Sequence, residues 1–244
     1  MAALTLEEFG GHGPVYGPAT GAALPGVVIL HGAEGPMAGW AHRFAAILAV
    51  HGFLALPLGY GAGDFFGAGP IRDVDLRAVP AAVAALAAHP RCCGAGLFGW
   101  SRGGEMALLA AVLAGPAAIP ALALHAPSDT VNGAFDPEEM RRTGRVRTAD
   151  PNGPRAWVWP GEEAALTPGA PIEIERYEGP VFLSVGTADE VWDHRMTLRL
   201  ADRLAAAGRP ADLLLAEGEG HGYSFPREPE LWARLIAFFE RALP

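Results

Sequence analysis

Ser101 stands in a short glycine-rich sequence that could turn its hydroxyl into a nucleophile. The sequence Gly99-Trp100-Ser101-Arg102-Gly103-Gly104 follows a short apolar run and opens an alanine-rich stretch that begins at Glu105. Small residues here let a strand turn sharply into a helix, so that the serine projects from the turn beside the free N–H groups of the helix N-terminus. The alternative is a tight turn in which Ser101 only caps the helix. The strand before it and the helix after it favour the nucleophile.

A serine hydroxyl needs a base to take its proton and an acid to orient that base. His221 and Asp189 stand in suitable places further along the chain. Asp189 follows the apolar run Val181 to Gly186, and His221 follows the next run, Ala211 to Ala216. The order serine, aspartate, histidine is typical of α/β-hydrolases. The sequence therefore predicts Ser101 as nucleophile, His221 as base and Asp189 as acid.

Two other carboxylates near Asp189 remain candidates for the acid. Glu190 is the next residue, and Asp193 lies four residues on, before a helical pattern that begins at His194. An aspartate in that position favours a helix cap. The choice of His221 among eight histidines rests on its position in the order.

Acyl transfer also requires N–H donors for the oxyanion of its tetrahedral intermediate. The loop His31-Gly32-Ala33-Glu34-Gly35 directly follows the first strong apolar run. In this kind of site one donor is the N–H after the nucleophile, and the other comes from such an early loop. We expect the backbone N–H groups of Arg102 and Ala33, although the loop alone could be an ordinary glycine turn.

The elements that must position these residues alternate along the chain. Short apolar runs predict buried strands, and longer amphipathic stretches between them predict helices. This alternation predicts one α/β domain over residues 1–244, with a mostly parallel central sheet covered by helices on both faces. The active site is expected at the carboxyl ends of the strands. The expected strands are 27–31, 53–57, 96–99, 119–125, 181–186 and 211–216, and the expected helices are 39–51, 71–89, 103–114, 194–207 and 229–243.

One stretch, from about residue 126 to 179, does not fit the alternation. It is rich in proline, glycine, charge and tryptophan, and it is too long for an ordinary connection. We expect a lid, inserted before the strand that carries Asp189. Its arginines could meet an acidic substrate, although a solvated loop face is the simpler interpretation. The arginines are Arg141, Arg142, Arg145 and Arg147. For the two tryptophans of the stretch, Trp157 and Trp159, we expect a packing role.

The composition excludes several classes of function. A formal charge of −9 opposes binding to nucleic acid, which depends on neutralising phosphates with Lys and Arg. Cys92 and Cys93 are adjacent and predict neither a disulfide framework nor, with the histidines, a metal site. No apolar run reaches spanning length, and the first residues do not resemble a secretory signal. We expect a cytoplasmic protein that needs no cofactor and acts on a small molecule, with no membrane or nucleic-acid partner.

Three segments together resemble the catalytic domain shared by acyl-CoA thioesterases and bile acid-CoA:amino acid N-acyltransferases. They are His89–Ala111, Ala170–Met196 and Gly218–Pro226, and the resemblance covers about residues 24 to 226. It implies the same roles for Ser101, Asp189 and His221. Arg102 and Gly104 replace a lysine and an alanine of that family, and Glu105 matches a glutamate of its elbow helix.

A second resemblance concerns the segment His31–Gly61, which is similar to the opening of dienelactone hydrolases. Those enzymes use a cysteine nucleophile and a glutamate in the early loop. Here the nucleophile is Ser101, and Gly32 stands where that glutamate would fall. This resemblance therefore implies the fold more than the reaction.

These inferences together predict a serine hydrolase that cleaves a carboxylic thioester or ester through an acyl-enzyme. The thioester preference comes from the resemblance to acyl-CoA thioesterases. The alternatives are a dienelactone-hydrolase-like esterase or lactonase, an acyltransferase, a peptidase acting on small peptides, and a non-catalytic module that keeps the fold.

Overall fold

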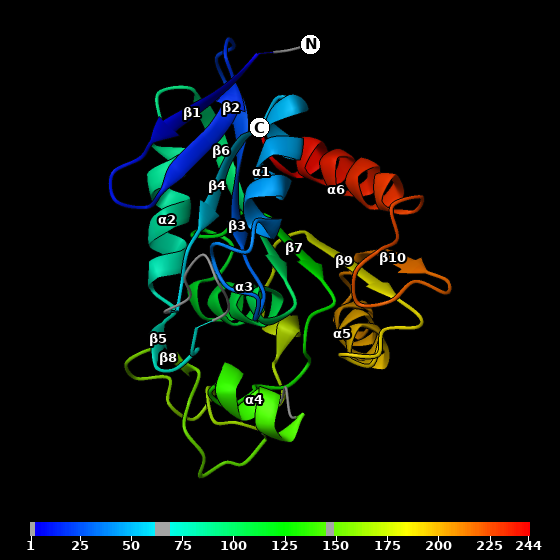
Figure 1. Cartoon of the computed structure of the whole chain (residues 1–244). Helices are drawn as coiled ribbons and strands as arrows, with labels where there is room; N and C mark the ends of the chain where they lie inside the picture. Colours follow the sequence, from blue (N-terminus) through cyan, green and yellow to red (C-terminus); the bar gives the residue numbers. More distant parts are fainter. Residues whose placement is uncertain (1–2, 62–68, 145–148) are drawn as a thin grey trace.

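The computed structural model describes residues 3–61, 69–144 and 149–244, which form an eight-stranded sheet with helices on both faces (Figure 1). The strands lie in the order β1-β2-β4-β3-β6-β7-β9-β10. All pairs from β4 to β10 are parallel. This confirms the predicted α/β class. The strands are β1 Leu4–Glu8, β2 Pro14–Pro18, β3 Leu24–Leu30, β4 Leu54–Leu58, β6 Cys92–Trp100, β7 Leu122–His125, β9 Val181–Gly186 and β10 Asp212–Ala216.

The first two strands were not expected from the sequence. β1 pairs antiparallel with β2, and β2 pairs antiparallel with β4, which places them at one edge of the sheet. Most of β1 is exposed, and β2 alternates between half-buried and buried residues. Such edge strands lack the continuous apolar run of a strand buried on both faces. The pattern that predicted the central strands was therefore absent here.

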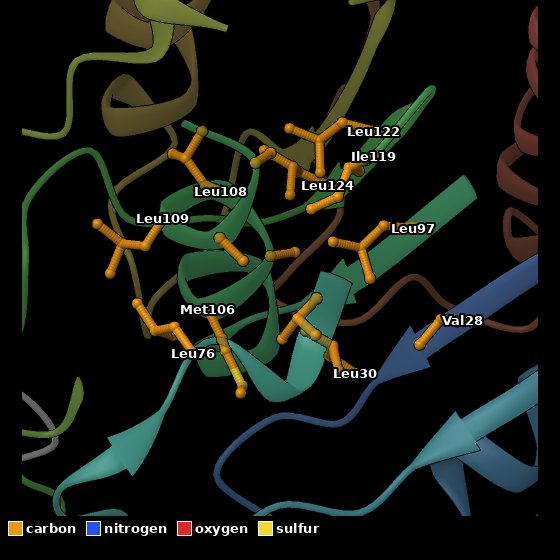
Figure 2. Close-up of a cluster of buried hydrophobic side chains, with 14 of the residues drawn as sticks. Val28, Leu30, Leu76, Leu97, Met106, Leu108, Leu109, Ile119, Leu122 and Leu124 are labelled. Atoms are coloured by element: carbon orange, nitrogen blue, oxygen red, sulfur yellow. The ribbon is translucent and has the colours of Figure 1, made fainter. Parts of the chain in front are cut away.

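Alternate residues of each central strand point into two different cores. Val27 and Ile29 of β3 pack with α1 Trp40–Val50 and α6 Glu228–Ala242 on one face. Val28 and Leu30 pack on the other face, where the helices are α2 Ala78–Ala87, α3 Arg102–Ala114 and α5 Arg195–Ala206. Figure 2 shows the second core, with Leu97, Leu122 and Leu124 from the sheet beside Met106, Leu108 and Leu109. Alternation of this kind follows from the two-residue period of a strand.

The expected helix over residues 71–89 is shorter in the structure, because α2 begins only at Ala78. The residues before it are hydrogen-bonded instead to the stretch from about residue 126 to 179, here called the long segment. Ile71 bridges to Phe135, and β5 Val74–Asp75 pairs with β8 Trp157–Val158. A backbone N–H that donates to a distant carbonyl cannot also donate within a helix, so tertiary pairing overrides the helical pattern here.

The segment from about residue 126 to 179 contains three short elements, α4 Pro137–Thr143, β8 and the 3₁₀ turn η1 Ile174–Arg176. Figure 1 shows most of it below the sheet, beside β5. Arg141 and Arg142 are exposed on it, whereas Arg145 and Arg147 lie outside the described residues. Among the described residues, none of the helices is both long enough and apolar enough to span a bilayer.

Candidate active site

Ser101 is the single residue between the end of β6 and the start of α3. Its backbone has φ 55° and ψ −120°, a conformation that residues with a side chain rarely adopt. The neighbouring glycines make this turn possible. A Cβ on Gly103 would lie 2.3 Å from the carbonyl oxygen of His31, and one on Gly99 would lie 2.3 Å from that of Gly103. The chain therefore forms the sharp turn that the sequence predicts, with the serine at its tip.

The structure brings Ser101, His221 and Asp189 together from three loops. The Nε2 atom of His221 lies 2.9 Å from Ser101 Oγ, and its Nδ1 atom lies 2.8 Å from Asp189 Oδ2. Both distances fit hydrogen bonds. The Asp189 side chain is completely buried, whereas that of His221 is partly exposed. A neutral imidazole with its proton on Nδ1 can thus donate to Asp189 and accept the proton of Ser101.

The backbone after Asp189 holds its carboxylate in place. Oδ1 accepts hydrogen bonds from the N–H groups of Val191 and Trp192, each at 2.9 Å. Burial by itself would raise the pKa of Asp189, but the hydrogen bond and charge of His221 and the two backbone donors outweigh it, and the net pKa is lowered. The carboxylate is therefore stabilised in its ionised form.

The other two carboxylates lie away from this arrangement. Glu190 is exposed, and Asp193 Oδ1 accepts from the N–H of Arg195 at 2.9 Å at the start of α5. Among the described residues, neither makes a hydrogen bond to His221. Their positions leave Asp189 as the carboxylate beside the histidine.

His125, at the end of β7, supports the loop that carries His221. It is fully buried, its Nδ1 lies 2.8 Å from Ser184 Oγ, and its Nε2 lies 3.0 Å from the backbone oxygen of His221. Burial lowers the pKa of His125 to about 4. The ring is therefore neutral near pH 7, and the carbonyl requires the proton on Nε2. This fits the core-edge role that is usual for such a histidine.

The two expected oxyanion donors lie on the loop after β3 and at the first residue of α3. Across residues 3–61, 69–144 and 149–244, the N–H groups of Ala33 and Arg102 have no hydrogen-bond partner. Contacts between His31 and Tyr60 hold the loop after β3 in place. The Tyr60 hydroxyl donates to the His31 carbonyl at 2.6 Å, and the His31 ring stacks on the Tyr60 ring with centroids 3.9 Å apart. Both N–H groups are thus free to donate to a further acceptor.

Glu34 is a site residue that the sequence analysis did not single out. Its Oε1 accepts from the N–H of Gly32 at 2.8 Å. Its Oε2 lies 2.3 Å from the position that a Cβ on Gly32 would take. The carboxylate thus fills the space of a side chain at position 32, where dienelactone hydrolases carry their early-loop glutamate. Burial raises the pKa of Glu34. The only signal in the sequence was a charged residue within a glycine-rich oxyanion loop.

A buried polar network joins the start of α3 to the long segment. The Arg102 guanidinium donates to Glu105 Oε2 at 3.0 Å and to the Gly133 carbonyl at 2.9 Å. Glu105 Oε1 accepts from the Asn132 N–H at 2.7 Å and from the Trp157 indole N–H at 2.8 Å. All four side chains are buried, so Trp157 has the packing role that was expected. This network also gives Glu105 the role that sequence alone left open.

Comparison with known proteins gives the family and the fold. The fold and the site define the class, an α/β hydrolase of the serine-hydrolase kind. Residues 73–244 match the family model described as Peptidase_S9, the prolyl oligopeptidase family, and the chain belongs to that family. A search of curated proteins found no match.

Solved structures share the fold at low sequence identity. A puromycin-hydrolyzing peptidase of Mycobacterium tuberculosis superposes with a TM-score of 0.70 at 21% identity. The match covers 99% of this chain and 39% of that one, so this chain spans well under half of its length. A dienelactone hydrolase-like promiscuous phosphotriesterase from metagenomic libraries superposes with a TM-score of 0.64 at 16% identity, and the match covers 100% of this chain and 99% of that one. A putative dienelactone hydrolase of Klebsiella pneumoniae superposes with a TM-score of 0.63 at 18% identity, and the match covers 99% of this chain and 98% of that one.

Proposed function

We propose that this chain hydrolyses a small carboxylic ester or thioester, with Ser101 as nucleophile, His221 as base and Asp189 as orienting acid. The observation that carries the proposal is the chain of two hydrogen bonds from Ser101 Oγ through His221 to Asp189, at 2.9 and 2.8 Å. The sharp turn at Ser101 gives further support, as do the N–H groups of Ala33 and Arg102, which have no hydrogen-bond partner among the described residues.

The first half of the reaction would form an acyl-enzyme. His221 Nε2 takes the proton of Ser101 as Oγ attacks the carbonyl carbon, and the N–H groups of Ala33 and Arg102 hold the oxyanion. His221 then gives that proton to the leaving oxygen or sulfur as its bond to carbon breaks. In the second half, His221 takes a proton from water, whose oxygen attacks the acyl carbon, and returns it to Ser101 as the acid leaves.

The kind of leaving group has two supported candidates. The resemblance to acyl-CoA thioesterases in three segments supports a thioester. Membership of the prolyl oligopeptidase family, which is named for peptidases, supports an amide or peptide as a second candidate. The triad chemistry is the same for both, since only the atom that receives the proton from His221 differs. We also propose that residues 126–144 and 149–179 cover the site, because hydrogen bonds from Arg102 and to Glu105 connect this segment to the start of α3.

The experiment that tests the proposal is intact-protein mass spectrometry after treatment with a fluorophosphonate, on the natural chain and on Ser101→Ala. We expect one adduct, absent from the variant. The same samples are then assayed with para-nitrophenyl esters, short and long acyl-CoAs, and peptidyl para-nitroanilides. The preferred donor separates esterase, thioesterase and peptidase. Absence of both adduct and turnover would instead favour a non-catalytic module.

A further inference from the structure

The carboxylate of Glu34 and the side chain of Ser101 face the same small space. The position that a Cβ on Gly32 would occupy lies 2.3 Å from Glu34 Oε2 and 3.2 Å from Ser101 Cβ. The other carboxylate oxygen, Oε1, is fixed by the Gly32 N–H. Oε2 and Ser101 Cβ thus both border the space that a side chain on Gly32 would take, and Glu34 lies on the loop that also carries the Ala33 N–H group.

This carboxylate forms no salt bridge among the described residues; burial raises its pKa, and this effect is larger than that of the charge of His221, which lowers it. The Arg102 and Arg43 side chains are engaged elsewhere. The Arg102 guanidinium is bound to Glu105 and the Gly133 carbonyl, and the Arg43 guanidinium is paired with Glu228. His221 is hydrogen-bonded to Asp189. A half-buried carboxylate that no salt bridge neutralises is costly even with one backbone hydrogen bond, so the site favours a ligand that neutralises it.

An ionised Glu34 would also oppose the reaction of a neutral substrate. Negative charge grows on the carbonyl oxygen in the transition state, next to the N–H groups of Ala33 and Arg102. A carboxylate on the same loop repels that charge. A cation placed between the two would remove the repulsion and bind the carboxylate.

We propose that Glu34 is a specificity-determining residue that selects substrates with an ammonium group a few bonds from the scissile carbonyl. The inference rests on the proposed acyl transfer at Ser101 and names the substrate class of that site. The ammonium belongs to the acyl part or to the leaving group, and both positions place it within reach of a carboxylate that shares the space of Ser101.

The test compares pairs of esters that match in shape and differ in charge. Alanine ethyl ester and ethyl isobutyrate differ in the acyl part, and acetylcholine and 3,3-dimethylbutyl acetate differ in the leaving group. Hydrolysis is followed by acid release at constant pH. We expect kcat/KM to favour the cationic member of one pair by about tenfold or more, as for a close charge pair. The pair that shows the preference locates the ammonium.

The decisive variant is Glu34→Gln, which keeps the size of the side chain and an oxygen that can accept from the Gly32 N–H. We expect its cationic-to-neutral ratio of kcat/KM to fall by about tenfold or more relative to the ratio of the natural chain. Glu34→Asp keeps the charge and should retain part of the preference. The matched control Glu217→Gln removes one exposed charge near the same face and should leave the ratio unchanged.

Two results would overturn this inference while leaving the proposed function intact. One is equal turnover of both members of both pairs by the natural chain. The other is an unchanged preference in Glu34→Gln, checked to be folded by circular dichroism. If Glu34→Gln does not fold, the ratios of the natural chain and of Glu34→Asp decide. Loss of all Ser101-dependent turnover and of the fluorophosphonate adduct would instead overturn the proposed function.

Discussion

Ser101 combines a reactive position with an unfavourable backbone. Its φ of 55° lies in a region where a Cβ is strained, and this is the residue whose hydroxyl meets His221. The strain is retained because the turn directs Oγ out of the sheet, toward the histidine.

We therefore expect two substitutions at this position to share their effect on turnover and to differ in their effect on stability. Ser101→Ala should abolish turnover at nearly unchanged stability, since alanine keeps the Cβ. Ser101→Gly should abolish turnover and raise the free energy of unfolding by about 1 kcal/mol, because glycine adopts this backbone without strain. Ester assays and urea unfolding check both. Normal turnover by either variant would contradict the role of Ser101.

Asp189 is expected to act through the orientation of His221. Asp189→Asn should lower kcat by roughly a hundredfold to ten-thousandfold, because an amide favours the wrong tautomer of the imidazole. The matched control is Glu190→Gln, on an exposed neighbour, which should keep the rate. Steady-state kinetics at one pH gives the kcat of both variants. A loss of kcat in Glu190→Gln with full activity in Asp189→Asn would assign the acid to Glu190.

At the scale of elements, the buried pair Arg102 and Glu105 fastens the long segment to α3. Removing Glu105 leaves a buried guanidinium without its carboxylate, and also frees the Asn132 and Trp157 donors. We expect Glu105→Ala to lower the free energy of unfolding by about 3 to 5 kcal/mol.

The control for this prediction is an exposed pair of the same kind. Asp75 and Arg77 are bound to each other at 2.6 Å on the surface, so Asp75→Ala should cost less than about 1 kcal/mol. Urea unfolding of both variants gives the comparison. An equally small loss in Glu105→Ala would show that the network does not fasten the segment.

The elements that sequence predicted best are those buried on both faces. The run Val181–Gly186 became β9 without a shift, because a buried parallel strand must be apolar throughout. The helix expected from residue 71 began late, since its first residues pair with Phe135 and β8 instead. No local pattern records such a distant partner.

The same distinction holds within the site. That Ser101, Asp189 and His221 come together could be predicted because each follows the carboxyl end of an apolar strand, in a fixed order; their catalytic roles stay a prediction. Glu34 and Glu105 could not, because their importance depends on where a flexible side chain points and on residues far along the chain. Glu105 meets Trp157 only after the segment between them has folded back.

At the scale of the whole molecule, two buried histidines make stability depend on pH. Burial lowers the pKa of His31 and of His125 to about 4 each, against about 6.5 in an unfolded chain. Between these values the unfolded state binds protons that the folded state does not. Their contribution is therefore fully present above pH 6.5 and is lost as the pH falls toward 4.

We expect the free energy of unfolding to fall by roughly 2 kcal/mol per histidine between pH 7 and pH 5. Urea denaturation at the two pH values measures the change. His125→Gln should reduce this dependence, whereas His51→Gln, on an exposed histidine, should not. The same slope in His125→Gln as in the natural chain would contradict the assignment.

The long segment leaves the sheet after β7 and returns to it at β9, and these two strands lie side by side. Its ends are therefore fixed by strand pairing, whatever lies between them, and lengthening such a loop costs little entropy. Ser101, Asp189 and His221 all stand outside it. In evolutionary terms, descendants of this fold could acquire new substrates through substitutions in residues 134–154 and 159–179, provided that Asn132 and Trp157 keep their hydrogen bonds to Glu105. Ser101, Asp189 and His221 would then be inherited unchanged while the segment between β7 and β9 diverged.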